Sequence, residues 1–160
     1  MKYREIKLKE EIQVALEALG FKEMTHVQEM GIPELLKKHN VMMKAPTGTG
    51  KTHAFLLPIL ENIDPTKKNV QAIIMAPTRE LATQISLVAR QCIKYMESDI
   101  SIGLLIGGKD RGRLIETMSQ TQPHIIIGTP GRLEDIIVKE KKVDIRYIQY
   151  VVLDETDMIV

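Results

Sequence analysis

The segment Val41-Met-Met-Lys-Ala-Pro-Thr-Gly-Thr-Gly-Lys-Thr52 indicates the fold class, because a short apolar run leads into a glycine-rich loop that opens a helix. A strand, such a loop and a helix, in that order, are the setting of a phosphate-binding loop. Its glycines let backbone N–H groups turn toward phosphate oxygens, Lys51 can reach the β and γ phosphates, and Thr52 can hold Mg²⁺. An ordinary glycine-rich turn is the alternative, and Gly-Lys-Thr at the end of the loop argues against it. The predicted loop comprises Ala45, Pro46, Thr47, Gly48, Thr49, Gly50, Lys51 and Thr52, with Ala45 where the general pattern has glycine.

Around this loop, short apolar runs alternate with longer amphipathic stretches, which predicts repeated β-α-β units and a parallel sheet. We expect strands at 41–44, 70–76, 100–106, 124–128 and 150–153, and helices at 52–61, 80–96, 111–119 and 132–138. Right-handed crossovers would cover both faces of the sheet. Upstream, the apolar spacing from Ile12 to Leu19 predicts a helix, and a second helical stretch runs from 27 to 38 with Gly31 and Pro33 inside it. The expected fold is therefore one α/β domain, a parallel β-sheet sandwiched by helices.

Composition limits the partners and the location. The 160 residues carry 22 Lys+Arg against 21 Asp+Glu, so no overall basic field indicates a nucleic-acid partner, and such a partner must be read from motifs. The lone Cys92 excludes an intramolecular disulfide and favours a reducing, cytoplasmic location. No apolar stretch approaches the roughly 18 residues of a membrane span, so we expect no membrane partner. The scattered histidines give little support for a structural zinc site.

A carboxylate pair completes the predicted phosphate site. Val151-Val-Leu-Asp-Glu155 ends an apolar strand in two acids and places Asp154 at the carboxyl edge of the sheet, where ligands bind in open α/β folds. Asp154 would bind Mg²⁺, and Glu155 would position or deprotonate the attacking water. Two acids alone are more often a solvated strand end, but pairing with the loop reverses that preference. Kinases, GTPases and transport ATPases share both motifs, so the class must come from elsewhere.

Three further loops follow the next strands at the same edge of the sheet. Pro77-Thr-Arg-Glu-Leu-Ala82, Gly107-Gly108 and Thr129-Pro-Gly-Arg-Leu133 combine tight turns, small residues, hydroxyl groups and helix starts. Such groups suit the phosphates of a nucleic-acid backbone better than base edges. Each loop alone could be a common turn, and Arg79 could simply pair with Glu80. Their joint occurrence in order favours one binding face.

With these motifs in order, the chain resembles the DEAD-box helicases of superfamily 2 over its whole length. Gly20-Phe-Lys-Glu-Met-Thr-His-Val-Gln28 is similar to the Q motif of that family, and Tyr3 takes the place of its upstream aromatic residue. The resemblance implies that Phe21 stacks on adenine and that Gln28 reads it, assisted by Thr25. A glutamine amide offers the donor and the acceptor that the edge of adenine needs. The family usually has a proline near this threonine, and Thr156 replaces the alanine of the acidic motif.

The resemblance also implies a domain organisation, cofactors and a nucleic-acid partner. Residues 1–160 would be an N-terminal RecA-like ATP-binding domain, with the Q-motif region at 1–33, and a second RecA-like domain of the same full-length chain would be missing. ATP and Mg²⁺ would be the cofactors, single-stranded or duplex RNA the partner, and Lys51, Asp154 and Glu155 the catalytic residues. Hydrolysis and unwinding would need the second domain, so this part alone would be inactive or nearly so. The implied ligands of the RNA backbone are Pro77, Thr78, Arg79, Gly107, Gly108, Thr129, Pro130, Gly131 and Arg132.

Two other functions stay open at this point. A DNA helicase of the same superfamily would share the phosphate loop and the two acids. A binding module that holds ATP and RNA without turnover is a second possibility, and for these 160 residues it could be literally true. A GTPase is disfavoured, because the chain contains no Asn-Lys-x-Asp element for reading guanine.

Overall fold

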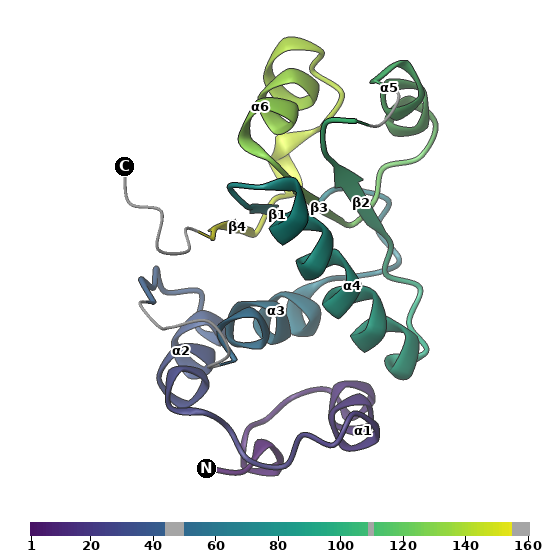
Figure 1. Ribbon diagram of the computed structural model, residues 1–160. Helices are drawn as coiled ribbons and strands as arrows, with labels where there is room; N and C mark the ends of the chain where they lie inside the picture. Colours follow the sequence, from purple (N-terminus) through teal and green to yellow (C-terminus); the bar gives the residue numbers. More distant parts are fainter. Residues whose placement is uncertain (44–49, 109–110, 155–160) are drawn as a thin grey trace. The chain divides into compact units, whose positions relative to one another are not determined.

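The computed structural model describes residues 1–43, 50–108 and 111–154 (Figure 1). The chain divides into two compact units, the first comprising Met1–Asn62 with Gln91–Ser98 and the second Ile63–Arg90 with Asp99–Val160. Helix α4 (Arg79–Met96) contributes to both units. The residues predicted to read adenine lie in the first unit, and the three loops predicted to bind a nucleic-acid backbone lie in the second.

The described part of the second unit is built on a parallel sheet whose strands follow the order β2-β3-β1-β4. The strands are β1 (Ala72–Met75), β2 (Ile102–Leu105), β3 (Ile125–Gly128) and β4 (Tyr150–Leu153). Isoleucine dominates β1 and β3, and β-branched side chains suit strands that are buried on both faces. In the register of the sheet Met75, Leu105 and Leu153 come level with Gly128. The loops that follow the strands therefore start from one edge.

One face of this sheet packs against the helical segments that follow β2 and β3 in the chain. Helix α5 (Arg111–Gln120) covers it together with α6 (Pro130–Leu133), which continues directly into the π-helical segment η2 (Glu134–Lys139). Proline suits the first position of α6, because its missing N–H has no partner there in any helix. A short helical turn, η3 (Ile145–Tyr147), precedes β4. The buried cluster between sheet and helices comprises Val70, Ile73, Leu105, Met118, Ile126, Leu133, Ile136 and Val143.

The first unit is helical. It contains η1 (Tyr3–Glu5), α1 (Glu10–Ala18), α2 (His26–Leu36) and α3 (Lys51–Asn62). Helix α1 buries Ile12, Ala15 and Leu16, which are the residues whose spacing predicted it. Helix α3 is buried along its whole middle, from Ala54 to Leu60, and packs against α2 and α1.

The sequence predicted this architecture with one error and with shifted ends of several helices and strands. The α/β fold with a parallel sheet flanked by helices is confirmed, and so are the strands predicted after residue 70 and the helices. The strand predicted at 41–44 is wrong for residues 41–43, which form no strand, and residue 44 lies outside the described residues. Met43 instead packs against α2, where a Cβ on Gly31 would lie only 2.7 Å from its sulfur, and this contact competes with strand pairing. The helix predicted at 132–138 begins earlier, at Pro130, and becomes π-helical from Glu134. In the described part of the chain, no helix combines the length and apolar character needed to cross a membrane.

Candidate functional site

Thr25 and Gln28 form a capping box at the start of α2. Oγ1 of Thr25 accepts from the backbone N–H of Gln28 at 3.4 Å, and Oε1 of Gln28 accepts from the backbone N–H of Thr25 at 3.0 Å. These reciprocal bonds satisfy backbone donors that a helix start leaves open. They also fix the direction of the Gln28 amide. Gln28 is only 2% exposed, so it is not a solvated helix residue.

The Gln28 amide has two further partners in the first unit. Its Oε1 accepts from the Tyr3 hydroxyl, and its Nε2 donates to the carbonyl oxygen of Gly50 at 3.1 Å. Gly50 has φ +81°, and a Cβ built there would lie 2.3 Å from Gln28 Nε2 and 3.1 Å from Thr25 Oγ1. Only glycine therefore fits beneath this amide. The structure thus joins the residues predicted to read adenine to the last glycine of the predicted phosphate loop.

Aromatic rings line the same region. The rings of Tyr3 and Phe21 meet edge to face, with centroids 6.3 Å apart, and the rings of Phe21 and His53 are tilted, with centroids 4.7 Å apart. Burial lowers the pKa of His53, so its ring is neutral at pH 7 and presents an apolar face beside Phe21. Burial also raises the pKa of Tyr3 to about 12, so its hydroxyl stays protonated. His53 was not among the predicted site residues, and its position directly after Thr52 was the available signal.

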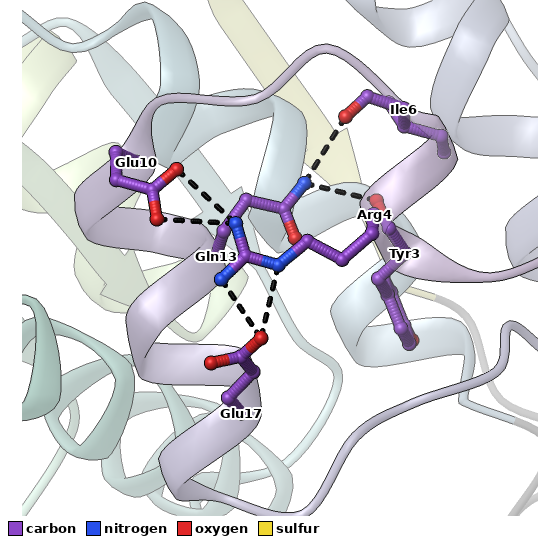
Figure 2. Close-up of polar contacts among 6 residues, drawn as sticks. All are labelled: Tyr3, Arg4, Ile6, Glu10, Gln13 and Glu17. Carbon is purple, nitrogen blue, oxygen red and sulfur yellow. Dashed lines mark hydrogen bonds and ion pairs between the residues drawn. The ribbon is translucent and has the colours of Figure 1, made fainter.

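Tyr3 is held in place by polar contacts between η1 and α1 (Figure 2). Nε2 of Gln13, which is 4% exposed, donates to the carbonyl oxygens of Tyr3 at 2.9 Å and Ile6 at 3.0 Å. The Arg4 guanidinium reaches Glu10 at 3.1 Å and Glu17 at 2.8 Å, both on α1. The exposed ion pairs contribute little to stability, whereas the buried Gln13 bonds anchor the turn. A residue far from Gln28 in the sequence is thereby fixed beside it.

The predicted phosphate loop and the predicted acidic motif lie only partly within the described residues. Lys51 and Thr52 are the first residues of α3, and a helix N-terminus favours anions through the direction of its backbone N–H groups and its dipole. In the second unit, Asp154 follows β4, is 5% exposed, and its backbone N–H donates to the carbonyl oxygen of Met75 at 2.8 Å. The predicted site residues Ala45, Pro46, Thr47, Gly48, Thr49 and Glu155 lie outside the described residues.

The first and second of the three predicted backbone-binding loops are in direct contact. Nη1 of Arg79 donates to the carbonyl oxygen of Gly107 at 3.1 Å. Gly108 has φ +86°, and a Cβ built on it would lie 2.5 Å from the same Arg79 nitrogen. Thr78 Oγ1 accepts from the N–H of Leu81 at 3.2 Å and so caps the start of α4. The alternative use of Arg79, an ion pair with the adjacent acid, is thus replaced by a contact between loops.

The third loop joins this surface. The N–H of Thr129 donates to Leu105 at 3.2 Å, and Pro130 opens α6. Two shallow depressions share Gly107. The first is also lined by Arg79, Glu80, Thr83, Ile106 and Gly108, and the second by Arg111, Thr129, Gly131, Arg132, Asp135 and Lys139. The three predicted loops therefore form one continuous surface.

The second depression is also lined by charged residues that were not predicted as site residues from the sequence, among them Arg111 and Asp135. Nε and Nη2 of Arg111 donate to the two carboxylate oxygens of Asp135 at 2.7 and 3.0 Å, and Nη2 also binds Glu140. Nη1 of Arg132 lies 3.6 Å from Asp135. The hydrogen bond from Arg111 lowers the pKa of Asp135, so that carboxylate is ionised at neutral pH. The surface thus contains arginines that are already paired with acids.

Among residues 1–43, 50–108 and 111–154, no group of three or more His, Cys, Asp or Glu side chains is placed to hold a metal ion. Mg²⁺ does not need one, because it is commonly bound through one or two protein groups together with phosphate oxygens and water. A buried carboxylate such as Asp154 fits that role.

Comparison with known proteins gives a consistent result. Residues 25–160 match the family model described as DEAD/DEAH box helicase. The chain is 47% identical over 147 residues to the DEAD-box ATP-dependent RNA helicase CshB of Listeria monocytogenes, covering 92% of this chain and 33% of that protein. It is 44% identical to CshB of Bacillus subtilis, covering 98% of this chain and 36% of that protein. The solved structure of a DEAD box protein from the hyperthermophile Methanococcus jannaschii superposes with a TM-score of 0.88 at 31% identity, covering 98% of this chain and 42% of that one. The chain thus spans about a third of the length of these two curated relatives.

Proposed function

This chain belongs to the DEAD/DEAH box helicase family, and we propose that it is the ATP-binding and RNA-backbone-binding part of an ATP-dependent RNA helicase. Both curated relatives compared above are named as ATP-dependent RNA helicases. Since the chain spans about a third of their length, we assign hydrolysis and duplex unwinding to a full-length protein with a second RecA-like domain. A cytoplasmic location is part of the proposal and is supported by the free, buried thiol of Cys92.

The proposed adenine pocket is formed by Phe21, Thr25 and Gln28. Phe21 offers a stacking face next to the neutral His53 ring. Gln28 offers an amide whose direction is fixed by the capping box. An amide held in one direction discriminates between bases, because a wrong base leaves a buried polar group unsatisfied, which costs about 1–3 kcal/mol.

At the phosphate end, residues 45–52 are proposed to wrap the phosphates, with Lys51 supplying positive charge. Thr52 and Asp154 are proposed to hold Mg²⁺, which neutralises charge on the phosphates when bound. Glu155 is proposed to position the attacking water. The described residues support this assignment through the start of α3 at Lys51 and the burial of Asp154 at the end of β4.

The observation that carries the proposal is the hydrogen bond from Gln28 to Gly50, because it links base recognition to the phosphate loop. The test measures ADP and GDP binding to the chain and to Gln28→Ala. We expect the chain to prefer ADP, and Gln28→Ala to lose that preference more than it loses overall affinity. Gln71→Ala is the matched control, because Gln71 is a similarly buried glutamine whose amide bonds go to Asp64 and Lys67 in the other unit. Equal binding of ADP and GDP by the unmodified chain would refute the adenine assignment.

The proposed nucleic-acid surface comprises the three loops of the second unit, with Arg79 and Arg132 as its cations. Comparing matched RNA and DNA single strands on the same chain separates an RNA helicase from a DNA helicase of the same superfamily. Tighter binding of RNA is the expected result, and tighter binding of DNA would favour the alternative.

A further inference from the structure

We propose that Arg111 is a positioning residue of the nucleic-acid surface, which holds the Gly107-Gly108 loop and the Thr129–Arg132 loop at a fixed spacing. The inference rests on the proposed function, because it concerns how the same surface keeps its shape. Arg111 begins α5, the next described residue after Gly108, and it belongs to none of the three loops predicted from the sequence.

The contacts of Arg111 join two segments that the chain separates widely. Asp135 lies 24 residues further along and Glu140 lies 29 residues further along, both on or just after η2. Two parallel bonds to Asp135, at 2.7 and 3.0 Å, fix the orientation as well as the distance. Because η2 follows the Thr129–Arg132 loop without a break, the start of α5 and the end of that loop are tied together.

The acidic partners explain why Arg111 positions the loops and does not bind phosphate itself. A carboxylate at a surface that meets a polyanion repels it, so Asp135 and Glu140 weaken binding unless they have another task. Their task in this structure is to bind Arg111, whose Nε and Nη2 donors they occupy. Asp135 also lies 3.6 Å from Arg132, so the same carboxylate orients a proposed phosphate ligand.

The expected size of the effect is modest. An exposed ion pair shifts an equilibrium by about 1.4- to fivefold, and a bidentate pair within a network lies toward the upper end. We therefore expect losses of about two- to fivefold in RNA affinity when the Arg111 pairs are removed.

The test uses Arg111→Gln, Asp135→Asn and the double variant, with Arg146→Gln as the matched control. Arg146 is also exposed and pairs with its own aspartate, Asp144, at 2.7 Å, so the control removes one positive charge and one ion pair in the same unit. Affinity for a single-stranded oligouridylate is measured over a series of NaCl concentrations. Each single variant should bind RNA more weakly than the unmodified chain. The double variant should bind RNA no more weakly than the single variant with the lower affinity, because both substitutions remove the same contact. The salt dependence of the affinity should match that of the control.

The Asp135→Asn result decides between positioning and simple electrostatics, because removing a negative charge should tighten RNA binding unless the lost contact matters more. Tighter binding by Asp135→Asn would overturn the proposal. The proposal would also be overturned if the plot of log affinity against log NaCl concentration were less steep for Arg111→Gln than for the control by about 0.7, since this is the change expected when one phosphate contact on a single strand is lost.

Hydrogen exchange provides a readout that does not depend on RNA. Arg111→Gln should speed the exchange of the amides of Gly107, Gly108, Gly131 and Arg132, whereas Arg146→Gln should not. If the unmodified chain bound no RNA, the proposed function would fail, and the exchange rates would still decide whether Arg111 couples the loops. Unchanged exchange in both loops would overturn the inference.

Discussion

Replacing Gly50 by alanine tests whether the Gln28 amide packs on the phosphate-loop glycine. Gly50 has φ +81°, and an added Cβ would lie 2.3 Å from Gln28 Nε2. The left-handed backbone costs about 1–2 kcal/mol for alanine, and displacing Gln28 from the Gly50 carbonyl costs about a further 0.5–1.5 kcal/mol. We therefore expect the free energy of unfolding to fall by about 1.5–3.5 kcal/mol, and ADP affinity to fall with it.

Gly20→Ala isolates the contact from the backbone strain. Gly20 has nearly the same backbone angle, φ +84°, lies in the same unit, and has nothing within 4 Å of the added Cβ. Both substitutions carry the same backbone cost and the same entropic gain from a stiffer unfolded chain. Urea denaturation of the two variants should therefore differ by about 0.5–1.5 kcal/mol, with Gly50→Ala the less stable, and calorimetric titration should show ADP binding impaired only there. Equal losses of stability in the two variants would show that the Gln28 amide does not pack against Gly50.

Other predictions concern Tyr3, the phosphate end and the RNA surface. The pKa of Tyr3 is raised to about 12 in the folded chain against about 10 when unfolded, so the stability that its buried hydroxyl contributes is full below pH 10 and falls by up to about 3 kcal/mol between pH 10 and 12. The free energy of unfolding, measured by denaturation across this range, should therefore decline less steeply for Tyr3→Phe than for the unmodified chain. Identical declines would mean that the Tyr3 hydroxyl is not buried. Lys51→Ala should weaken nucleotide binding measured by titration. In the full-length protein, Glu155→Gln should bind ATP but hydrolyse it slowly, and unchanged turnover would show that another residue positions the water. RNA binding should be tolerant of sequence and weakened by salt, because the proposed ligands are backbone amides, hydroxyl groups and two arginines; strong preference for one sequence at high salt would contradict this.

The sequence predicted those parts of the fold where local preference and burial agree. The isoleucine runs of β1 and β3 are both β-branched and fully apolar, so no other element competes for them. At 41–43 the run is short and contains two unbranched methionines, and a side-chain contact between Met43 and α2 outweighs the weak strand preference. The π-helical segment after α6 leaves no clear mark on helical spacing, so its position could not be read from the residues.

The candidate site divides in a similar way. Thr25 and Gln28 were named from the family resemblance, and the capping box that joins them is a local pattern that the structure adds. The loops were predictable because turns have their own residues. Arg111 was not, because its partners lie 24 and 29 residues away and only the folded chain brings them together. The hydroxyl contact between Tyr3 and Gln28 spans 25 residues and belongs to the same class.

The two contacts of the Gln28 side-chain oxygen bear on how a base could bind to it. Its Oε1 already accepts from the Tyr3 hydroxyl and the Thr25 N–H, which is the full capacity of a carbonyl oxygen. An incoming amino group can bind that oxygen only by taking the place of one of these donors, so binding at the oxygen is an exchange of partners. Such an exchange gains little free energy for the correct base, since one hydrogen bond replaces another. A base without such an amino group leaves the opened contact unpaired, so the Tyr3 hydroxyl and the Thr25 N–H compete with every nucleotide for the Gln28 oxygen.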